Sequence, residues 1–163
     1  ISKIIKVKPD QVTLVPDPPG ALTSSFGWDC EENKNFLRDT VSEFQQNKIR
    51  VSIFINPSIK TLENLEIIKT DRVELYTYDF AHLFNENNNK SIKSYIDVSN
   101  FLRKEFPKIE FNAGHDLNLD NLRFFLDNIQ DIKEVSIGHA LICDTFEFGL
   151  EETIKKYLSL TKN

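Results

Sequence analysis

The sequence predicts an α/β protein built on a parallel sheet, and two observations lead to this prediction. Short runs of β-branched and aromatic residues alternate with helical patterns from residue 11 to residue 160. The strand runs, above all residues 50–55, are almost continuously apolar, as strands covered on both faces are. Strands and helices that alternate in this way form parallel sheets whose faces are covered by the connecting helices.

Each element is expected from its own local signals. Asp29 can cap a helix on which Leu37, Val41 and Phe44 recur along one face, and Pro107 ends a later helix. A polar run over residues 85–90 is expected to be a loop. The expected strands cover residues 11–15, 50–55, 72–76, 109–112 and 134–137. The expected helices cover residues 31–47, 59–68 with Ser58 as the cap, 92–106, 118–128 and 150–160.

The first residues have the pattern of the end of a helix. Ile1, Ile4 and Ile5 fall at helical spacing, Pro9 stops the pattern, and residue 1 is not Met. We therefore expect the chain to start inside a domain, as part of something longer. Five βα units after such a start fit a (β/α)8 barrel without its first three units, and a five-stranded open sheet fits the count equally well.

Composition narrows the class of protein. The 163 residues are 40% hydrophobic and 28% charged, which is typical of one globular domain. A net charge of −5 argues against a nucleic-acid partner, which needs a basic patch, but allows a local phosphate pocket. Cys30 and Cys143 are too few for a disulfide framework, so we expect reduced thiols in a cytoplasmic protein. No apolar run is long enough to span a bilayer, so no membrane partner is expected.

A carboxylate on the third expected strand is a candidate for chemistry. Alternation sets Glu74 opposite to Val73 and Leu75, which points its side chain into the interior of a barrel. A carboxylate there is costly unless it is paired or used. A structural, ion-paired Glu is the alternative interpretation. Thr23, in the long loop after the first strand, is a second candidate, with a turn or cap role equally expected.

Two Gly-His pairs, Gly114-His115 and Gly138-His139, end the next two strands. Imidazole suits proton transfer near neutral pH, glycine lets a phosphate approach the backbone, and a helix after each pair would add its N-terminal dipole. A structural role for a single His is the alternative. His82 is expected to be solvated in a loop. A metal site made by His115, His139 and Asp116 is disfavoured because no metal-binding spacing occurs, and a serine hydrolase is disfavoured because no GxSxG motif occurs.

Taken in order along nearly the whole chain, these motifs resemble those of the pyridoxine 5'-phosphate synthase family. The similarity lies at the strand ends and in the strands themselves. Its segments are residues 112–118 (NAGHDLN), 137–142 (IGHALI), 149–152 (GLEE), 13–16 (TLVP), 51–55 (VSIFI) and 73–77 (VELYT).

The resemblance implies a (β/α)8 TIM barrel of which this chain holds about five C-terminal βα units, with residues 1–163 as a single domain. It implies a transferase of vitamin B6 biosynthesis, which condenses 1-deoxy-D-xylulose 5-phosphate with 3-amino-2-oxopropyl phosphate to give pyridoxine 5'-phosphate, phosphate and water. It further implies no metal or organic cofactor, a cytoplasmic location, and a homo-oligomer in which dimers assemble into octamers. We expect these residues alone to be inactive, because an incomplete barrel leaves strand edges open.

By position, the resemblance implies a role for six residues. The proton donor would be His115 and the transition-state stabiliser Glu74, and the substrate and phosphate contacts would be Thr23, Asp116, Gly138 and His139. Some members have Gly where Asp116 stands, so we expect its backbone N–H to make the contact, since a carboxylate repels phosphate. Tyr78 and the Pro18-Pro19-Gly20 loop also depart from the family pattern.

The resemblance further implies that the bases of the family lie on strands that this chain does not contain. Two other functions stay open: a non-catalytic phosphate-binding α/β domain, and another phosphate-handling barrel enzyme. A Schiff-base aldolase is disfavoured within the second class, because none of the five expected strands ends in a Lys.

Overall fold

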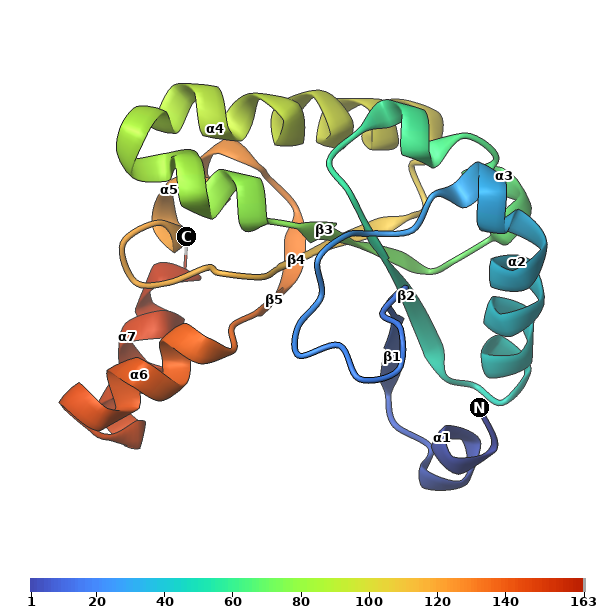
Figure 1. The fold of residues 1–163 in the computed structure, drawn as a ribbon, viewed down its shortest axis with the longest axis horizontal. Coiled ribbons are helices and arrows are strands. Elements are labelled where there is room, and N and C mark those ends of the chain that lie inside the picture. The colour runs from blue at the N-terminus through green and yellow to red at the C-terminus, as the bar shows by residue number, and fades with distance from the viewer. Residues whose placement is uncertain (163) are drawn as a thin grey trace.

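The sheet at the centre of the fold has five parallel strands that pair in chain order, as the computed structural model of residues 1–162 shows (Figure 1). Every neighbouring pair is parallel. The parallel α/β class is therefore confirmed. The strands are β1 (Gln11–Leu14), β2 (Arg50–Ile55), β3 (Arg72–Tyr76), β4 (Glu110–Gly114) and β5 (Ile132–Ser136).

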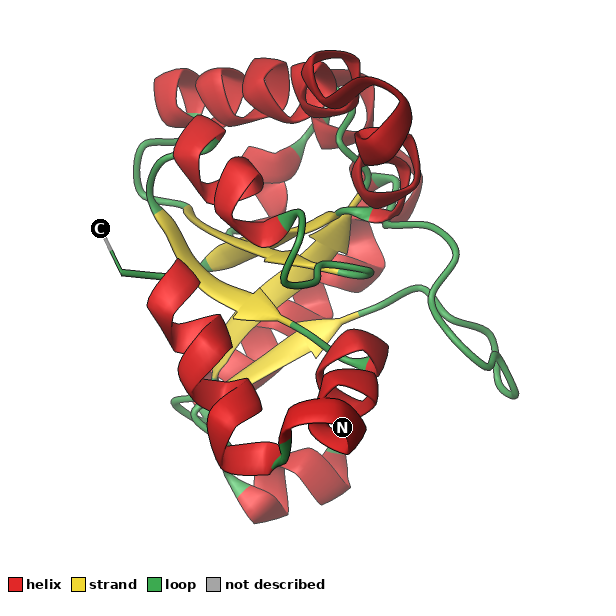
Figure 2. Ribbon diagram, turned by 90° about the vertical axis from the view of Figure 1, so that its left-hand side faces the viewer, coloured by secondary structure: helices red, strands yellow, loops and turns green. Residues whose placement is uncertain are grey.

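The helices lie outside the curved sheet, and its concave face is left without a helical cover by residues 1–162 (Figure 2). Asp29 caps the second of them as predicted, since its Oδ1 accepts from the backbone N–H groups of Glu31 and Glu32 at 3.0 Å each. The helices are α1 (Ser2–Val7), α2 (Cys30–Gln46), α3 (Leu65–Ile68), α4 (Tyr78–Glu105), α5 (Leu122–Asn128), α6 (His139–Phe148) and α7 (Leu150–Leu160), with a 3-10 turn η1 (Ile59–Leu62). Helix α7 has the bounds that the sequence predicts, whereas α6 is not among the expected elements.

Three expectations about helices and loops are wrong, and the ends of the strands differ from the expected ones by at most two residues. The helix over residues 59–68 is interrupted at Asn64, whose φ of 64° is left-handed, and Ser58 makes no side-chain cap. The loop over residues 85–90 is helical, because α4 starts at Tyr78 and continues through a kink at Asn87. The helix from residue 118 starts only at Leu122.

Asparagine side chains explain the late start of α5. Asn118 Oδ1 accepts from the N–H of Asn121 at 3.1 Å, and Asn121 Oδ1 accepts from the N–H of Asn118 at 2.9 Å. These reciprocal bonds close a turn before the helix begins, since Asn side chains compete with helical backbone hydrogen bonds.

The sheet curves so strongly that its two edge strands approach each other on the concave face. Gln11 of β1 donates from Nε2 to Oε2 of Glu134 of β5 at 2.9 Å. In a flat sheet, four strand spacings would separate β1 and β5 by about 19 Å. Pairing in chain order and this curvature belong to a barrel wall and not to an open doubly wound sheet, which decides between the two architectures that the strand count left open.

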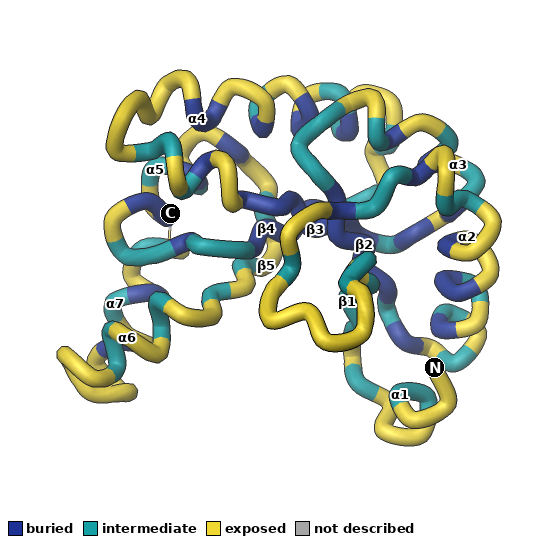
Figure 3. The backbone as a smooth tube through the Cα atoms, in the orientation of Figure 1, coloured by how far each residue is buried: buried dark blue, intermediate teal, exposed yellow. Residues whose placement is uncertain are grey.

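The apolar core lies between the convex face of the sheet and the helices (Figure 3). Val73 and Leu75 of β3 are fully buried there, and the rings of Phe80 and Tyr95 from α4 lie 5.0 and 5.5 Å from the ring of Phe125 of α5. The concave face instead carries polar and charged side chains, so the expectation of a sheet covered by helices on both faces does not hold within residues 1–162.

Two smaller expectations concern the thiols and the membrane. Cys30 is buried, Cys143 is exposed, and both are free thiols, as predicted. Within residues 1–162, no helix combines the length and the apolar character that a membrane crossing requires.

Candidate active site

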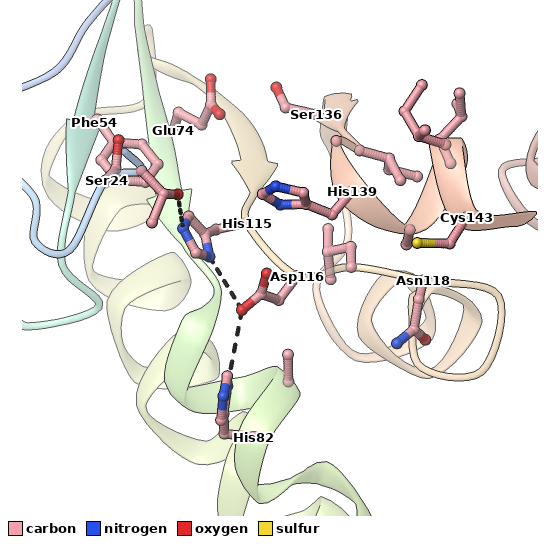
Figure 4. Close-up of a pocket in the computed structure, with 18 of the residues that line it drawn as sticks. Ser24, Phe54, Glu74, His82, His115, Asp116, Asn118, Ser136, His139 and Cys143 are labelled. Atoms are coloured by element: carbon pink, nitrogen blue, oxygen red, sulfur yellow. Dashed lines mark hydrogen bonds and ion pairs between the residues drawn. The ribbon is translucent and has the colours of Figure 1, made fainter. Parts of the chain in front are cut away.

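A cavity of about 1220 Å³ opens at the C-terminal ends of the strands (Figure 4). This is the end of the sheet at which parallel α/β folds place their sites. The residues to which the resemblance gives roles all line it, namely Thr23, Glu74, His115, Asp116, Gly138 and His139. The structure thus brings the predicted residues to one place, while their chemical roles stay predictions.

Glu74 reaches the cavity because alternation along β3 turns it away from the core. Its side chain is buried, and its Oε2 accepts from the Thr13 hydroxyl at 3.2 Å. Burial raises the pKa of Glu74, an effect that hydrogen bonds from the Ser136 and Thr13 hydroxyls only partly oppose. Within residues 1–162, Glu74 has no ion-pair partner, so the chain offers no support for a structural ion pair. A buried, unpaired carboxylate with a raised pKa is typical of functional sites.

Gly114 provides the space that this carboxylate occupies. It lies on β4, and a Cβ at this position would overlap Oε1 of Glu74 and would approach the Cβ of Ser136 to 2.9 Å. The sequence suggests that glycine here admits a phosphate to the backbone. In the structure, the side chain of Glu74 fills that space, so the close approach serves the carboxylate.

His115 is held between two polar neighbours. Its Nε2 lies 3.1 Å from the Thr23 hydroxyl, and its Nδ1 lies 3.3 Å from Oδ2 of Asp116. The edge of its ring meets Tyr76 at 4.8 Å, and its side chain is only 15% exposed. The Thr77 hydroxyl donates to the carbonyl oxygen of His115. The imidazole is therefore fixed from several sides, as a proton-transfer group needs to be.

The second Gly-His pair opens helix α6 directly. Gly138 is its N-cap, and no atom lies within 4 Å of the position of a Cβ there, so the backbone is open to the cavity. The first backbone N–H groups of the ten-residue helix α6 have no partner within the helix, and free N–H groups of this kind are donors to anions in other proteins. The matching expectation after Gly114-His115 is wrong, because α5 begins only at Leu122.

The loop that carries Thr23 is anchored to the neighbouring strand β2 at its end. The N–H of Gly27 donates to Asn56 Oδ1 at 3.0 Å, and the N–H of Trp28 donates to the carbonyl of Phe54 at 2.8 Å. A Cβ on Gly27 would overlap the backbone at residues 55 and 56, so only glycine permits this approach. Next to Thr23 itself, the Ser24 hydroxyl donates to Oδ2 of Asp17 at 2.7 Å and the Tyr76 hydroxyl donates to the Ser24 carbonyl at 3.3 Å, so the loop is fixed on both sides of the contact with His115.

Sequence reasoning misplaced His82 and did not single out Ser136. His82 is exposed, but it belongs to α4, lines the cavity and stacks on Tyr78 with 3.8 Å between ring centroids. The i, i+4 spacing of Tyr78 and His82 would have indicated this stack had the segment been predicted as a helix. Ser136 could have been found by alternation from Glu134, which places both side chains on the concave face.

The metal site considered as an alternative would use His115, His139 and Asp116, which all line this cavity. Within residues 1–162, no three His, Cys, Asp or Glu side chains lie close enough together to hold a metal ion.

Comparisons with known proteins point to one family. The family model described as "Pyridoxal phosphate biosynthesis protein PdxJ" matches residues 1–163. A protein of Flavobacterium johnsoniae named pyridoxine 5'-phosphate synthase is 46% identical over 162 residues, which are 99% of this chain and 68% of the relative. Proteins of the same name from Parabacteroides distasonis and Cytophaga hutchinsonii are each 45% identical, with 96% and 97% of this chain and 65% and 66% of the relatives covered. The chain thus spans about two thirds of the length of these relatives.

Proposed function

The chain belongs to the family described as pyridoxal phosphate biosynthesis protein PdxJ, and from this premise we propose that it forms part of a pyridoxine 5'-phosphate synthase. The reaction joins 1-deoxy-D-xylulose 5-phosphate to 3-amino-2-oxopropyl phosphate and releases phosphate and water. The observation that carries the proposal is the arrangement of Glu74 and His115, a buried unpaired carboxylate and a fixed imidazole at one cavity.

The acid–base work of this reaction suits these two side chains. Loss of water and of phosphate requires a proton on each leaving oxygen, and His115 donates it from Nε2, the nitrogen beside Thr23. The amine of one substrate and the ketone of the other combine with loss of water to form an imine. When this imine is protonated it is a cation, and a buried carboxylate stabilises that charge. Because the pKa of Glu74 is raised, this carboxyl also takes up a proton more readily than an exposed Glu.

The substrate phosphates are held mainly by backbone groups. The open N-terminus of α6 at Gly138 and His139 offers N–H donors and the positive end of a helix dipole. Thr23 adds a hydroxyl, and Asp116 contributes its N–H. This set favours phosphorylated small molecules as substrates.

We also propose how this chain takes part in a larger assembly. Residues 1–163 act as a single domain that supplies the C-terminal part of a TIM barrel, in a cytoplasmic homo-oligomer in which dimers build an octamer. Size-exclusion chromatography with light scattering on the full-length protein measures this, and a monomer at micromolar concentration would contradict it.

The central test is turnover by the full-length protein. With both substrates present, pyridoxine 5'-phosphate should form. The variants His115→Ala and Glu74→Gln should each slow it by roughly 10²- to 10⁴-fold, the usual contribution of a positioned acid or base. Glu147→Gln, an exposed acid on α6, is the matched control and should turn over normally. No product from the unaltered protein, combined with phosphate binding in calorimetry that survives Glu74→Gln, would favour the non-catalytic phosphate-binding domain instead.

A further inference from the structure

Three polar side chains that line the cavity form a cluster, and His115 is the only one of them whose side chain has a role in the proposed chemistry. Oδ2 of Asp116 lies 3.3 Å from Nδ1 of His115 and 3.9 Å from Nδ1 of His82 (Figure 4). A single carboxylate oxygen thus lies between two imidazoles, one from the end of β4 and one from α4. His82 in turn is held by its stack on Tyr78 and by a contact of 3.1 Å between its Nδ1 and the carbonyl of that residue.

An unusual backbone conformation makes this cluster possible. His115 has φ of 96° and Asp116 has φ of 57°, both in the left-handed region that residues other than glycine rarely adopt. In an extended strand, consecutive side chains point to opposite faces, whereas here both reach the same cavity. The bond from the Thr77 hydroxyl to the carbonyl of His115 holds the turn. Unfavourable backbone of this kind persists where the surroundings enforce it, and it concentrates at functional sites.

The Asp116 carboxylate is placed to accept a hydrogen bond from Nδ1 of His115. This nitrogen is buried, and within residues 1–162 no acceptor meets full hydrogen-bond geometry to it, so Asp116 at 3.3 Å is an ion-pair contact. Such catalytic contacts are often poorly aligned without substrate and tighten when it binds. The hydrogen bond that one ring nitrogen makes decides which nitrogen is left to exchange protons.

We propose that Asp116 is a positioning residue that keeps a proton on Nδ1 of His115 and leaves Nε2 to face Thr23 and the substrate. His82 is a second, weaker positioning residue. Its Nδ1 contacts the Tyr78 carbonyl at 3.1 Å and lies 3.9 Å from the carboxylate, so it acts on Asp116 through charge when its ring is protonated. The inference deepens the proposed function and rests on it. The imidazolium gives its Nε2 proton to the leaving oxygen as the C–O bond breaks, and the ring remains neutral with its Nδ1 proton facing Asp116. Other groups that face this ring are Tyr76 of β3 and Tyr78 of α4.

The contacts of Asp116 with the two imidazoles also reduce the repulsion between its negative charge and a substrate phosphate. A carboxylate at the mouth of a phosphate site should repel the substrate. The side chain of Asp116 is directed at two imidazoles, either of which offsets its charge when protonated, while its backbone N–H stays available for the anion.

Nitrogen NMR of the full-length protein with labelled histidine tests the proposal without any turnover. Neutral His115, assigned by comparison with His115→Gln, should carry its proton on Nδ1. Asp116→Gly should shift it to Nε2 or to a mixture, and the fold should survive because glycine readily adopts φ of 57°. His82→Gln should shift the tautomer less, in the same direction. Asp120→Asn, an exposed acid in the same loop, is the control and should change nothing.

Kinetics provide the second measurement. Asp116→Gly and Asp116→Asn should lower kcat by roughly 10- to 100-fold with little change in KM, as loss of an orienting partner does. An unchanged His115 tautomer in Asp116→Gly would overturn the proposal, as would a raised KM at normal kcat, which would make Asp116 a substrate contact only. An unaltered protein that forms no product but shows the Nδ1 tautomer would refute the synthase assignment and leave the positioning intact.

Discussion

Arg72 is the central cation of a charged network on the concave face, and its replacement by Met measures what that network contributes to stability. Its Nε and Nη2 lie 2.8 and 2.7 Å from Oε2 of Glu110, and its Nη1 lies 2.5 Å from Oε1 of Glu134. The Arg72 side chain is only 8% exposed, whereas both carboxylates are 44% exposed. Met keeps the length of the apolar stem, so Arg72→Met removes little except the charge and its hydrogen bonds.

The expected loss follows from these exposures. Breaking a buried ion pair by removing one partner destabilises a protein by about 3–5 kcal/mol, because the other charge remains buried and unpaired. Here water can solvate the two remaining carboxylates, so we expect a smaller loss in the free energy of unfolding, about 2–3 kcal/mol.

The pH dependence has a definite sign. Burial acts to raise the pKa of Glu134, but hydrogen bonds and charges from Arg72, Gln11 and Arg50 outweigh it and lower that pKa. A lowered pKa gives stability that is present above the ordinary Glu value of about 4.3 and is lost as the pH falls through the folded-state pKa. The difference in stability between the unaltered protein and Arg72→Met should therefore shrink on acidification.

Urea denaturation of the full-length protein, followed by circular dichroism at neutral and acidic pH, is the assay. The control is Arg38→Met, since Arg38 pairs with Asp39 at 2.8 Å on the surface, and its midpoint should match that of the unaltered protein. The reasoning is refuted if Arg72→Met has the same midpoint as the control at neutral pH, or if its deficit grows as the pH falls.

Three further changes address the cavity and the thiols. Glu74→Gln should leave the unfolding midpoint at neutral pH unchanged or raise it, while turnover falls. Burial raises the pKa of Glu74, so its negative charge destabilises the folded protein at any pH above the ordinary Glu pKa. A clear loss of stability in this variant would contradict the reasoning. Gly114→Ala should lose about 1–3 kcal/mol of stability and displace Glu74, and normal turnover in this variant would show that the overlap is harmless. Burial raises the pKa of the Cys30 thiol to about 12, so a thiol reagent should modify only Cys143 in the folded protein, and reaction of both at equal rates would refute the burial argument.

The strands and the cavity could be predicted because their signals are local. Alternation along residues 72–76 placed Val73 and Leu75 in the core and Glu74 in the cavity, and each Gly-His pair marked the end of a strand. These patterns depend on the two-residue alternation of side chains along a strand and not on the elements that pack against that strand.

The first half of α4 could not be predicted from local signals. Residues 85–90 are polar, and Asn has low helix propensity, yet the segment is helical apart from the kink at Asn87. Phe80 and Phe84 of this helix pack their rings against Phe124, at 6.5 and 5.5 Å, and such tertiary contacts override propensity. Because that helix was missed, the approach of His82 to Asp116 was missed with it.

The bend at residues 115 and 116 was also beyond sequence reasoning. Neither His nor Asp signals a left-handed backbone as glycine does. The conformation depends on the Thr77 hydroxyl, which lies 38 residues away along the chain. Contacts of this kind appear only once β3 and β4 are side by side.

Strand alternation places the charged network around Arg72 and the cavity residues around Glu74 on the same face of the same strands, as two successive layers of side chains. Thr13, Glu74 and Ser136 each stand two residues beyond Gln11, Arg72 and Glu134 on the same strands. A shift of one residue in the register of any strand would turn the side chains of both layers on that strand to the convex face. Charged groups would then be buried against the helices, and the cavity would lose its polar side chain from that strand. The charged layer therefore forms its contacts only when the strands are in the correct register, and that same register is what brings the cavity residues together.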